Sequence, residues 1–196
     1  MDIQPVTLEG ERVRLEPMRA DHLDALTEAG AFDVLWKWTG NKATTREDMK
    51  DYMDTALKEA AAGVSLPFVT IDKKSGRIIG STRFGNIDRA NRRVEIGWTW
   101  ITPEFQRTYV NSEAKYLMLR QAFEVWKCMR VELKTDVLND KSRNAMLRMG
   151  AKEEGVLRKH SVTYSGRIRD TIYYSVLDDE WPAVREGLLR ALNRPG

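Results

Sequence analysis

The sequence predicts a single α/β domain over residues 1–196, in which a central mixed, mostly antiparallel sheet of about seven strands is flanked by helices. Two observations predict this class. Between residues 94 and 137 the apolar pattern changes from alternation to helical spacing and back, which indicates two parallel strands joined by a right-handed crossover. Alternating segments with short turns lie on both sides of this unit and indicate antiparallel neighbours.

The first half of the chain contains four predicted strands and two predicted helices. The strands cover residues 13–18, 68–71, 78–84 and 94–101. One helix covers residues 20–30 and ends at Gly30, and a second runs to about Ala62, with Thr44 or Thr45 as its N-terminal cap. Simple alternation in the fourth strand places Val94, Ile96, Trp98 and Trp100 on one face of the sheet and Glu95, Gly97 and Thr99 on the other.

The second half begins with a helix predicted over residues 112–127, whose apolar stripe contains Ala114, Leu117, Met118, Ala122 and Val125. A strand follows over residues 131–137. The helix predicted over residues 139–149 is closed by Gly150, at the position where a left-handed cap is expected. Two strands, near residues 156–164 and 168–177, precede a last helix that begins near Trp181.

The composition indicates in which cellular compartment the protein works and whether it binds a metal. No apolar run approaches the ~20 residues that span a bilayer, and the N-terminus lacks the pattern of a secretory signal. The single cysteine, Cys128, excludes an intramolecular disulfide and is expected to be a small buried side chain. We therefore expect a cytoplasmic protein without a membrane segment. His22 and His160 show no metal-ligand spacing, so we expect no metal.

The segment before the helix at residue 112 carries the first functional signal. A Trp-rich strand ends near residue 101, and residues 104–111 lead directly into that helix. The N-terminus of a helix presents unpaired backbone N–H groups and the positive end of a dipole, which together bind anions. Arg107 adds a positive charge. The segment is therefore predicted to bind a pyrophosphate.

The order of these elements resembles the GNAT N-acetyltransferase superfamily, and specifically its RimJ/RimL-like branch, which includes ribosomal-protein N-terminal acetyltransferases. Three motifs carry the resemblance. They are the loop Gln106-Arg107-Thr108-Tyr109-Val110-Asn111, the helix opening Asn139-Asp140-Lys141-Ser142 followed by Gly150, and the strand Glu95-Ile96-Gly97-Trp98. The resemblance covers nearly the whole chain and implies the GNAT fold.

The resemblance implies acetyl-CoA as cosubstrate and direct transfer of its acetyl group to a primary amine. By resemblance, the pyrophosphate is bound by residues 106–112, namely Gln106, Arg107, Thr108, Tyr109, Val110, Asn111 and Ser112, and the pantetheine arm by Asn139. The amide of Ile101 and the gap beside Gly97 are expected to face the thioester. The acceptor is a protein N-terminus, such as that of a ribosomal protein, or a small amine. A homodimer is also implied.

The phosphate loop departs from the family pattern at two residues. Tyr109 and Asn111 stand where the family usually has glycine or alanine. Tyrosine adopts a positive φ only at a cost, so Tyr109 is expected to place its ring near the ligand and to weaken the site. Asn111 is expected to cap a helix that begins at Ser112.

Acetyl transfer to an amine requires a base that removes a proton from the amine, a donor that stabilises the oxyanion and a group that protonates the departing thiolate. Glu95 is the candidate base, and the competing interpretation is an ion-paired strand glutamate. Ser142 is the candidate donor to the thiolate by resemblance, and capping of the helix is its competing role. Tyr174 and its neighbour Tyr173 are rival donors on opposite faces of a late strand.

Four tryptophans could line an acceptor pocket. Trp36 and Trp38 lie in a segment that borders the acceptor site in similar proteins, whereas Trp98 and Trp100 are expected to pack in the core.

Two other functions remain compatible with the sequence. A non-catalytic acyl-CoA sensor would explain Tyr109 in the phosphate loop. A ribosome- or RNA-associated protein would fit the net charge of +3, although basic and acidic residues are mixed along the chain.

Overall fold

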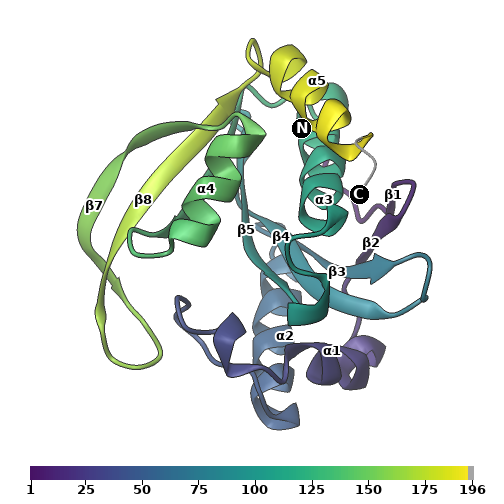
Figure 1. Ribbon diagram of the computed structural model, residues 1–196, viewed down its shortest axis with the longest axis vertical. Helices are drawn as coiled ribbons and strands as arrows, with labels where there is room; N and C mark the ends of the chain where they lie inside the picture. The colour runs from purple at the N-terminus through teal and green to yellow at the C-terminus, as the bar shows by residue number, and fades with distance from the viewer. Residues whose placement is uncertain (194–196) are drawn as a thin grey trace.

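The computed structural model describes residues 1–193 as one sheet with helices on both faces (Figure 1). The strands are β1 (Leu8–Glu9), β2 (Val13–Pro17), β3 (Leu66–Asp72), β4 (Ile78–Asp88), β5 (Arg93–Ile101), β6 (Arg130–Asp136), β7 (Lys152–Val162) and β8 (Ile168–Leu177). The α-helices are α1 (Leu23–Gly30), α2 (Arg46–Ala61), α3 (Tyr109–Arg120), α4 (Asp140–Met149) and α5 (Trp181–Leu192). Short 3-10 turns cover Ala20–His22, Asp33–Leu35 and Pro103–Phe105, and a π-helical turn covers Gln121–Val125.

The sheet contains eight strands in the order β1-β2-β3-β4-β5-β6-β8-β7. All neighbouring strands are antiparallel except β5 and β6, which are parallel and are connected through α3. The predicted mixed, mostly antiparallel sheet is therefore confirmed. The strand beyond the predicted seven is the two-residue β1. Strands β7 and β8 form a long hairpin that bows away from the body of the molecule (Figure 1).

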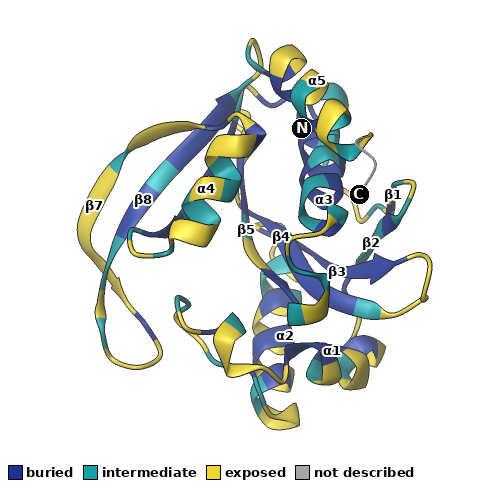
Figure 2. Ribbon diagram, viewed as in Figure 1, coloured by how far each residue is buried: buried dark blue, intermediate teal, exposed yellow. Residues whose placement is uncertain are grey.

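Each face of the sheet has its own hydrophobic core (Figure 2). On one face α1 and α2 pack around Leu26, Trp36 and Trp100. On the other face α3 and α5 pack on β-strand residues that include Phe84 and Ile96. Because the two cores lie on opposite faces of the sheet, a side chain on β5 points either toward α1 and α2 or toward α3 and α5.

Predicted helix ends are confirmed where local chemistry sets them. Thr45 caps α2, accepting from the Asp48 amide at 3.2 Å, while the Asp48 carboxylate accepts from the Thr45 amide at 3.3 Å. Gly150 ends α4 with a φ of 101°, which glycine adopts without a side-chain clash. Cys128 is buried as expected, and burial raises the pKa of its thiol to about 11.

The predicted alternation in β5 is wrong beyond Gly97. Trp98 has a φ of 50°, and the pairing with β4 shifts register between Ser81 and Arg83, so β5 contains a bulge. Ile96 packs with the α3 core, whereas Trp100 packs with the α1–α2 core. The bulge therefore moves the strand by one residue and reverses the two faces.

The predicted start and phase of the third helix are also wrong. Helix α3 begins at Tyr109, and its cap is Thr108, whose hydroxyl accepts from the Val110 amide at 3.3 Å, rather than Asn111. After Arg120 the chain forms a π-helical turn, which changes the angular position of later residues. Val125, which helical spacing places on the buried stripe, is consequently exposed.

Within residues 1–193, no helix has the length and apolar character needed to cross a bilayer.

We predict that Gly85→Ala destabilises the protein by about 1–3 kcal/mol, because a β-carbon there would overlap the Trp98 ring that supports the bulge. Urea unfolding followed by tryptophan fluorescence measures the change. Gly187→Ala is the matched control, since Gly187 lies in α5 with open space around it. The control should gain up to about 1 kcal/mol. Equal stability of the Gly85 variant and the wild type would contradict this account of the bulge.

Candidate active site

The strands β5 and β6 are paired at only three positions, Arg93, Val94 and Glu95 with Arg130, Val131 and Glu132. Beyond this short ladder β5 continues to Ile101 and β6 to Asp136 without pairing to each other (Figure 1). The bulge at Trp98 bends β5 at this point. The β6-facing edge of β5 therefore carries backbone groups that are available to a ligand.

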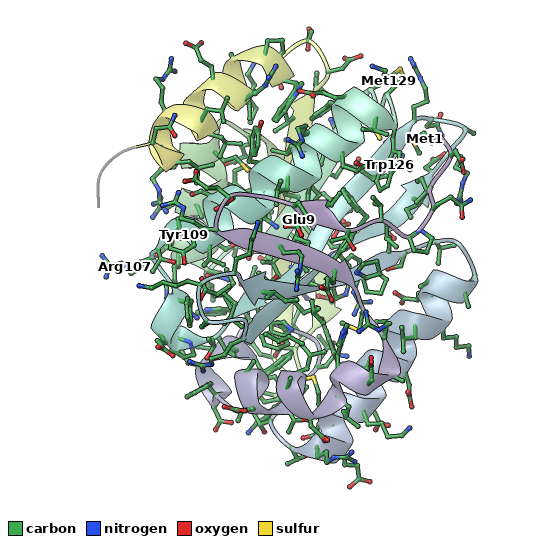
Figure 3. All side chains as sticks on the ribbon, turned by 90° about the vertical axis from the view of Figure 1, so that its right-hand side faces the viewer. Met1, Glu9, Arg107, Tyr109, Trp126 and Met129 are labelled. Carbon is green, nitrogen blue, oxygen red and sulfur yellow. The ribbon has the colours of Figure 1, made fainter. Side chains whose placement is uncertain are left out.

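The N-terminus of α3 lies at one end of this divergence. Arg107, just before the helix, holds a φ of 66° and is exposed, and Figure 3 shows it at the edge of the molecule. The amides of Tyr109 and Asn111 have no acceptor within the helix, since they belong to its first turn. Val110 and Ser112 lie in the same turn, so the predicted phosphate-binding residues are brought together. The arrangement suits a phosphate or pyrophosphate.

Tyr109 does not obstruct this turn, and the expectation of a strained Tyr109 is wrong. The left-handed conformation belongs to Arg107, and Tyr109 is the first helical residue. Its hydroxyl donates to Asp72 Oδ1 at 2.6 Å, and the Arg12 guanidinium lies 4.3 Å from its ring centre. The bond to Asp72 raises the pKa of Tyr109 to about 12. The ring is therefore fixed against the β2–β3 side of the helix.

Gln106 connects β5 to α4 across the diverging strands. Its amide nitrogen donates to the Ile101 carbonyl at 2.8 Å, and its amide oxygen accepts from Lys141 Nζ at 2.6 Å. Ile101 and Gln106, both predicted to contact acetyl-CoA, thus lie together beside the first turn of α4.

The start of α4 places the other predicted residues on the same side of the sheet. Asn139 caps the helix, because its side-chain oxygen accepts from the Ser142 backbone N–H at 3.2 Å. The Asn139 side-chain nitrogen donates to Thr135 Oγ1 at 3.2 Å. Ser142 is therefore capped by Asn139 and is not itself the cap. Tyr174 lies beneath α4 with no exposed surface, and its hydroxyl accepts from Arg143 Nε at 3.3 Å.

Glu95 lies on the opposite face of the sheet. Its side chain is 2% exposed, accepts from Asn86 Nδ2 at 2.8 Å and forms an ion pair with Lys134 Nζ at 3.0 Å. The missing side chain of Gly97 leaves room for the carboxylate, since a β-carbon there would lie 2.9 Å from Glu95 Oε1. Lys134 Nζ also lies 5.6 Å from the ring centre of Tyr173. Tyr173, and not Tyr174, thus shares a face with Glu95.

The tryptophans divide differently from the sequence expectation. Trp36 is 1% exposed and packs against Tyr52 and Trp100 in the core. Trp98 is 37% exposed beside Glu95, since the bulge turns it outward. Trp38 lies near the β7–β8 hairpin, where its carbonyl accepts from Arg169 Nη1 at 3.1 Å. Trp98 and Trp38 are therefore the two that can contact an acceptor.

Two buried cations near the divergence were missed by sequence reasoning. Lys115 on α3 is 8% exposed and donates to Thr99 Oγ1 at 2.7 Å, and burial lowers its pKa to about 7. Arg83 on β4 is 2% exposed, with its guanidinium 4.9 Å from the Trp98 ring and 2.9 Å from Glu59. A lysine three residues before Met118 in the apolar stripe was the available signal for Lys115.

Surface hollows of 490 Å³ beside Val156–Lys159 and 240 Å³ beside Ala25 and Ile78 lie away from the diverging strands. The candidate site is thus defined by backbone geometry and buried charge. Within the described residues, no group of three or more histidine, cysteine and acidic side chains is placed to hold a metal.

The chain is similar to several proteins that are named N-acetyltransferases. A putative ribosomal N-acetyltransferase, YdaF of Bacillus subtilis, is 36% identical over 106 residues, which are 54% of this chain and 57% of that relative. A GCN5-related N-acetyltransferase from Brucella melitensis is 34% identical, with a TM-score of 0.90 over 97% of this chain and 86% of that one.

RimJ of Mycobacterium smegmatis, solved in complex with CoA-disulfide, shares the fold, with a TM-score of 0.84 over 95% of each chain at 23% identity. The family model of the GNAT acetyltransferase domain matches residues 12–152, which include β2 to β6, the first turn of α3 and all of α4. The chain therefore belongs to the GNAT acetyltransferase family.

Proposed function

We propose that this protein transfers an acetyl group from acetyl-CoA to a primary amine by direct transfer. The observation that carries the proposal is the divergence of β5 and β6 between two different chemical environments. Anion-binding amides of α3 lie at one end on one face, and the Glu95 carboxylate lies on the other face. A thioester held at the divergence is then within reach of an amine from the opposite side.

The residues of α3 and α4 fit the cosubstrate. The first-turn amides of α3 and the charge of Arg107 bind the pyrophosphate, which carries negative charge. The Lys141–Gln106 hydrogen bond holds the start of α4 next to the loop that precedes α3. Asn139 and Ser142, at the start of α4, then provide hydrogen bonds to the pantetheine arm of the cosubstrate. The CoA-disulfide complex of the RimJ structure supports this assignment through its shared fold.

Glu95 is the proposed general base. An attacking amine must be neutral, whereas lysine and α-amino groups have pKa values near ~10.4 and ~7.7–8.0. Glu95 accepts the proton, directly or through one water, as the nitrogen bonds to the thioester carbon. Backbone N–H groups at the Trp98 bulge stabilise the oxyanion, and Ser142 donates a hydrogen bond toward the departing sulfur. Tyr174 is enclosed in the core and has no part in this scheme.

The acceptor that we propose is a protein N-terminus, with a small-molecule amine as the other case. The name of the Bacillus relative points toward ribosomal proteins. An α-amino group has the lower pKa of the two common protein amines, so Glu95 meets a smaller energetic barrier to deprotonating it. A cytoplasmic location and a homodimer belong to the same proposal, and light scattering of the purified protein tests the second.

No specific observation in the structure favours either alternative, the acyl-CoA sensor or the RNA-associated protein. An acyl-CoA sensor was suggested by Tyr109, whose hydroxyl is bonded to Asp72 on the β2–β3 side of α3. For an RNA-associated protein the basic residues remain mixed with acidic partners, as in the pairs of Arg93 and Arg130 with Glu132.

Calorimetry with CoA and with acetyl-CoA is expected to show micromolar binding by the wild type, on the order of −8 kcal/mol. Tyr109→Gly should not bind more tightly, because the ring does not cover the site, and it should melt at lower temperature through loss of the Asp72 bond. Tyr109→Phe separates the hydroxyl from the ring. Absence of binding by the wild type, with recovery in Tyr109→Gly, would contradict the open site.

Glu95→Gln is expected to lower kcat/KM by about 10²–10⁴-fold and to change the pH–rate profile, because the group that accepts the proton is lost. The assay follows release of CoA thiol with N-terminal peptides and free amines as acceptors. Glu132→Gln is the matched control, since Glu132 pairs with Glu95 across the ladder but is held by Arg93 and Arg130. An unchanged profile in Glu95→Gln would remove Glu95 from the role of base.

A further inference from the structure

Lys115 is a buried cation without an acidic partner. It projects from the side of α3 that packs on the sheet and is 8% exposed. The nearest acidic residue on its helix, Glu113, accepts from the Arg12 amide at 3.0 Å and pairs with the Arg12 guanidinium at 3.6 Å. Within residues 1–193 Lys115 forms no salt bridge. Burying a lone charge is costly, so an anion that binds beside Lys115 would stabilise its charged form.

The one hydrogen bond of Lys115 points at the diverging strands. Its Nζ donates to Thr99 Oγ1 at 2.7 Å, and Thr99 contacts Thr82 Oγ1 at 2.8 Å. An ammonium group has three donors, so two remain for a ligand. Thr99 is exposed, whereas Thr82 is 1% exposed. The buried Lys115 ammonium is therefore linked through Thr99 to the exposed surface of β5.

Thr99 is next to the bulge and on the α3 face. Going back along β5 from the end nearest the first turn of α3, the chain passes Ile101, then Thr99 and Trp98, so an extended arm laid along this strand would pass them in that order. In the proposed function, the end of that arm is the thioester. Its sulfur becomes an anion when the acetyl group leaves, since the carbon–sulfur bond breaks with both electrons on sulfur.

We propose that Lys115 receives this sulfur, binding the CoA thiolate as an ion pair and supplying its proton. The inference rests on the proposed function and adds a residue to it. As the amine nitrogen bonds to the acetyl carbon, the carbon–sulfur bond breaks and the Lys115 ammonium gives its proton to sulfur. The proton lost by the amine goes to Glu95 on the other face. Exchange with solvent then restores both groups.

The lowered pKa of Lys115, about 7 through burial, is consistent with this role. A thiol such as that of free cysteine has a pKa near ~8.5. The Lys115 ammonium therefore gives up a proton more readily than an exposed lysine does, which favours transfer to the leaving sulfur. The hydroxyl of Thr99 orients the ammonium by accepting its hydrogen bond.

The test compares CoA with desulfo-CoA, which lacks only the sulfur, by calorimetry on three proteins. The wild type is expected to bind CoA about tenfold more tightly than desulfo-CoA, as a charge-assisted hydrogen bond would give. Lys115→Met should lose this preference and bind the two ligands equally. Lys58→Met is the control, because Lys58 is an exposed lysine on α2, on the other face of the sheet, and it should keep the preference.

Each other outcome is decisive. Equal weakening of both ligands by Lys115→Met would place Lys115 on the pantetheine amides and overturn the assignment to sulfur, as would an unchanged preference. Lack of binding of either ligand to the wild type would overturn the proposed function, and this inference with it. Circular dichroism and melting show whether Lys115→Met is folded, and Lys115→Gln, which keeps a donor without the charge, should give the same loss of preference.

Discussion

The site depends on one structural constraint, the limit of the β5–β6 ladder to three residue pairs. Parallel strands normally satisfy their backbone groups along their length. Here the left-handed conformation of Trp98 inserts a bulge directly after the ladder, and β5 separates from β6. The Trp98 ring is accommodated by the absence of a side chain at Gly85 and lies near the Arg83 guanidinium. The same residue therefore lies where the strands separate and exposes an aromatic surface on the Glu95 side of the sheet.

The opening separates two sets of charge. The carboxylate of Glu95, paired with Lys134, lies on the α2 face, and the ammonium of Lys115 lies on the α3 face. A reaction that removes a proton from an amine and adds one to a thiolate needs a base and an acid that do not neutralise each other. The intervening sheet keeps Glu95 and Lys115 apart, and in the mechanism we propose both act on one thioester held at the divergence.

The sequence was sufficient for elements whose signals are local. Thr45 and Asn139 cap the starts of α2 and α4, and Gly150 ends α4, through hydrogen bonds or backbone conformation that a few residues determine. The crossover from β5 to β6 follows from the apolar pattern alone. The family motifs also indicated residues 106–112 and Asn139, which the structure places at the starts of α3 and α4 on the same face of the sheet. Features set by tertiary packing were not readable: the bulge that reverses the faces of β5 and the π-helical turn. Alternation placed Tyr173 and Tyr174 on opposite faces, but only the sheet order shows which faces Glu95. Lys115 was hidden because burial of a charge depends on what surrounds it.

In the complex that we propose, the cosubstrate enters from the α3 face and its thioester lies at the bulge, opposite Glu95. A crystal structure of the protein with CoA is the decisive measurement of this placement. We expect the pyrophosphate on the amides of Tyr109 and Asn111, and the sulfur beside Trp98 within hydrogen-bond distance of Lys115 Nζ. A CoA molecule bound on the α2 face, or one whose sulfur points away from the divergence of β5 and β6, would contradict it.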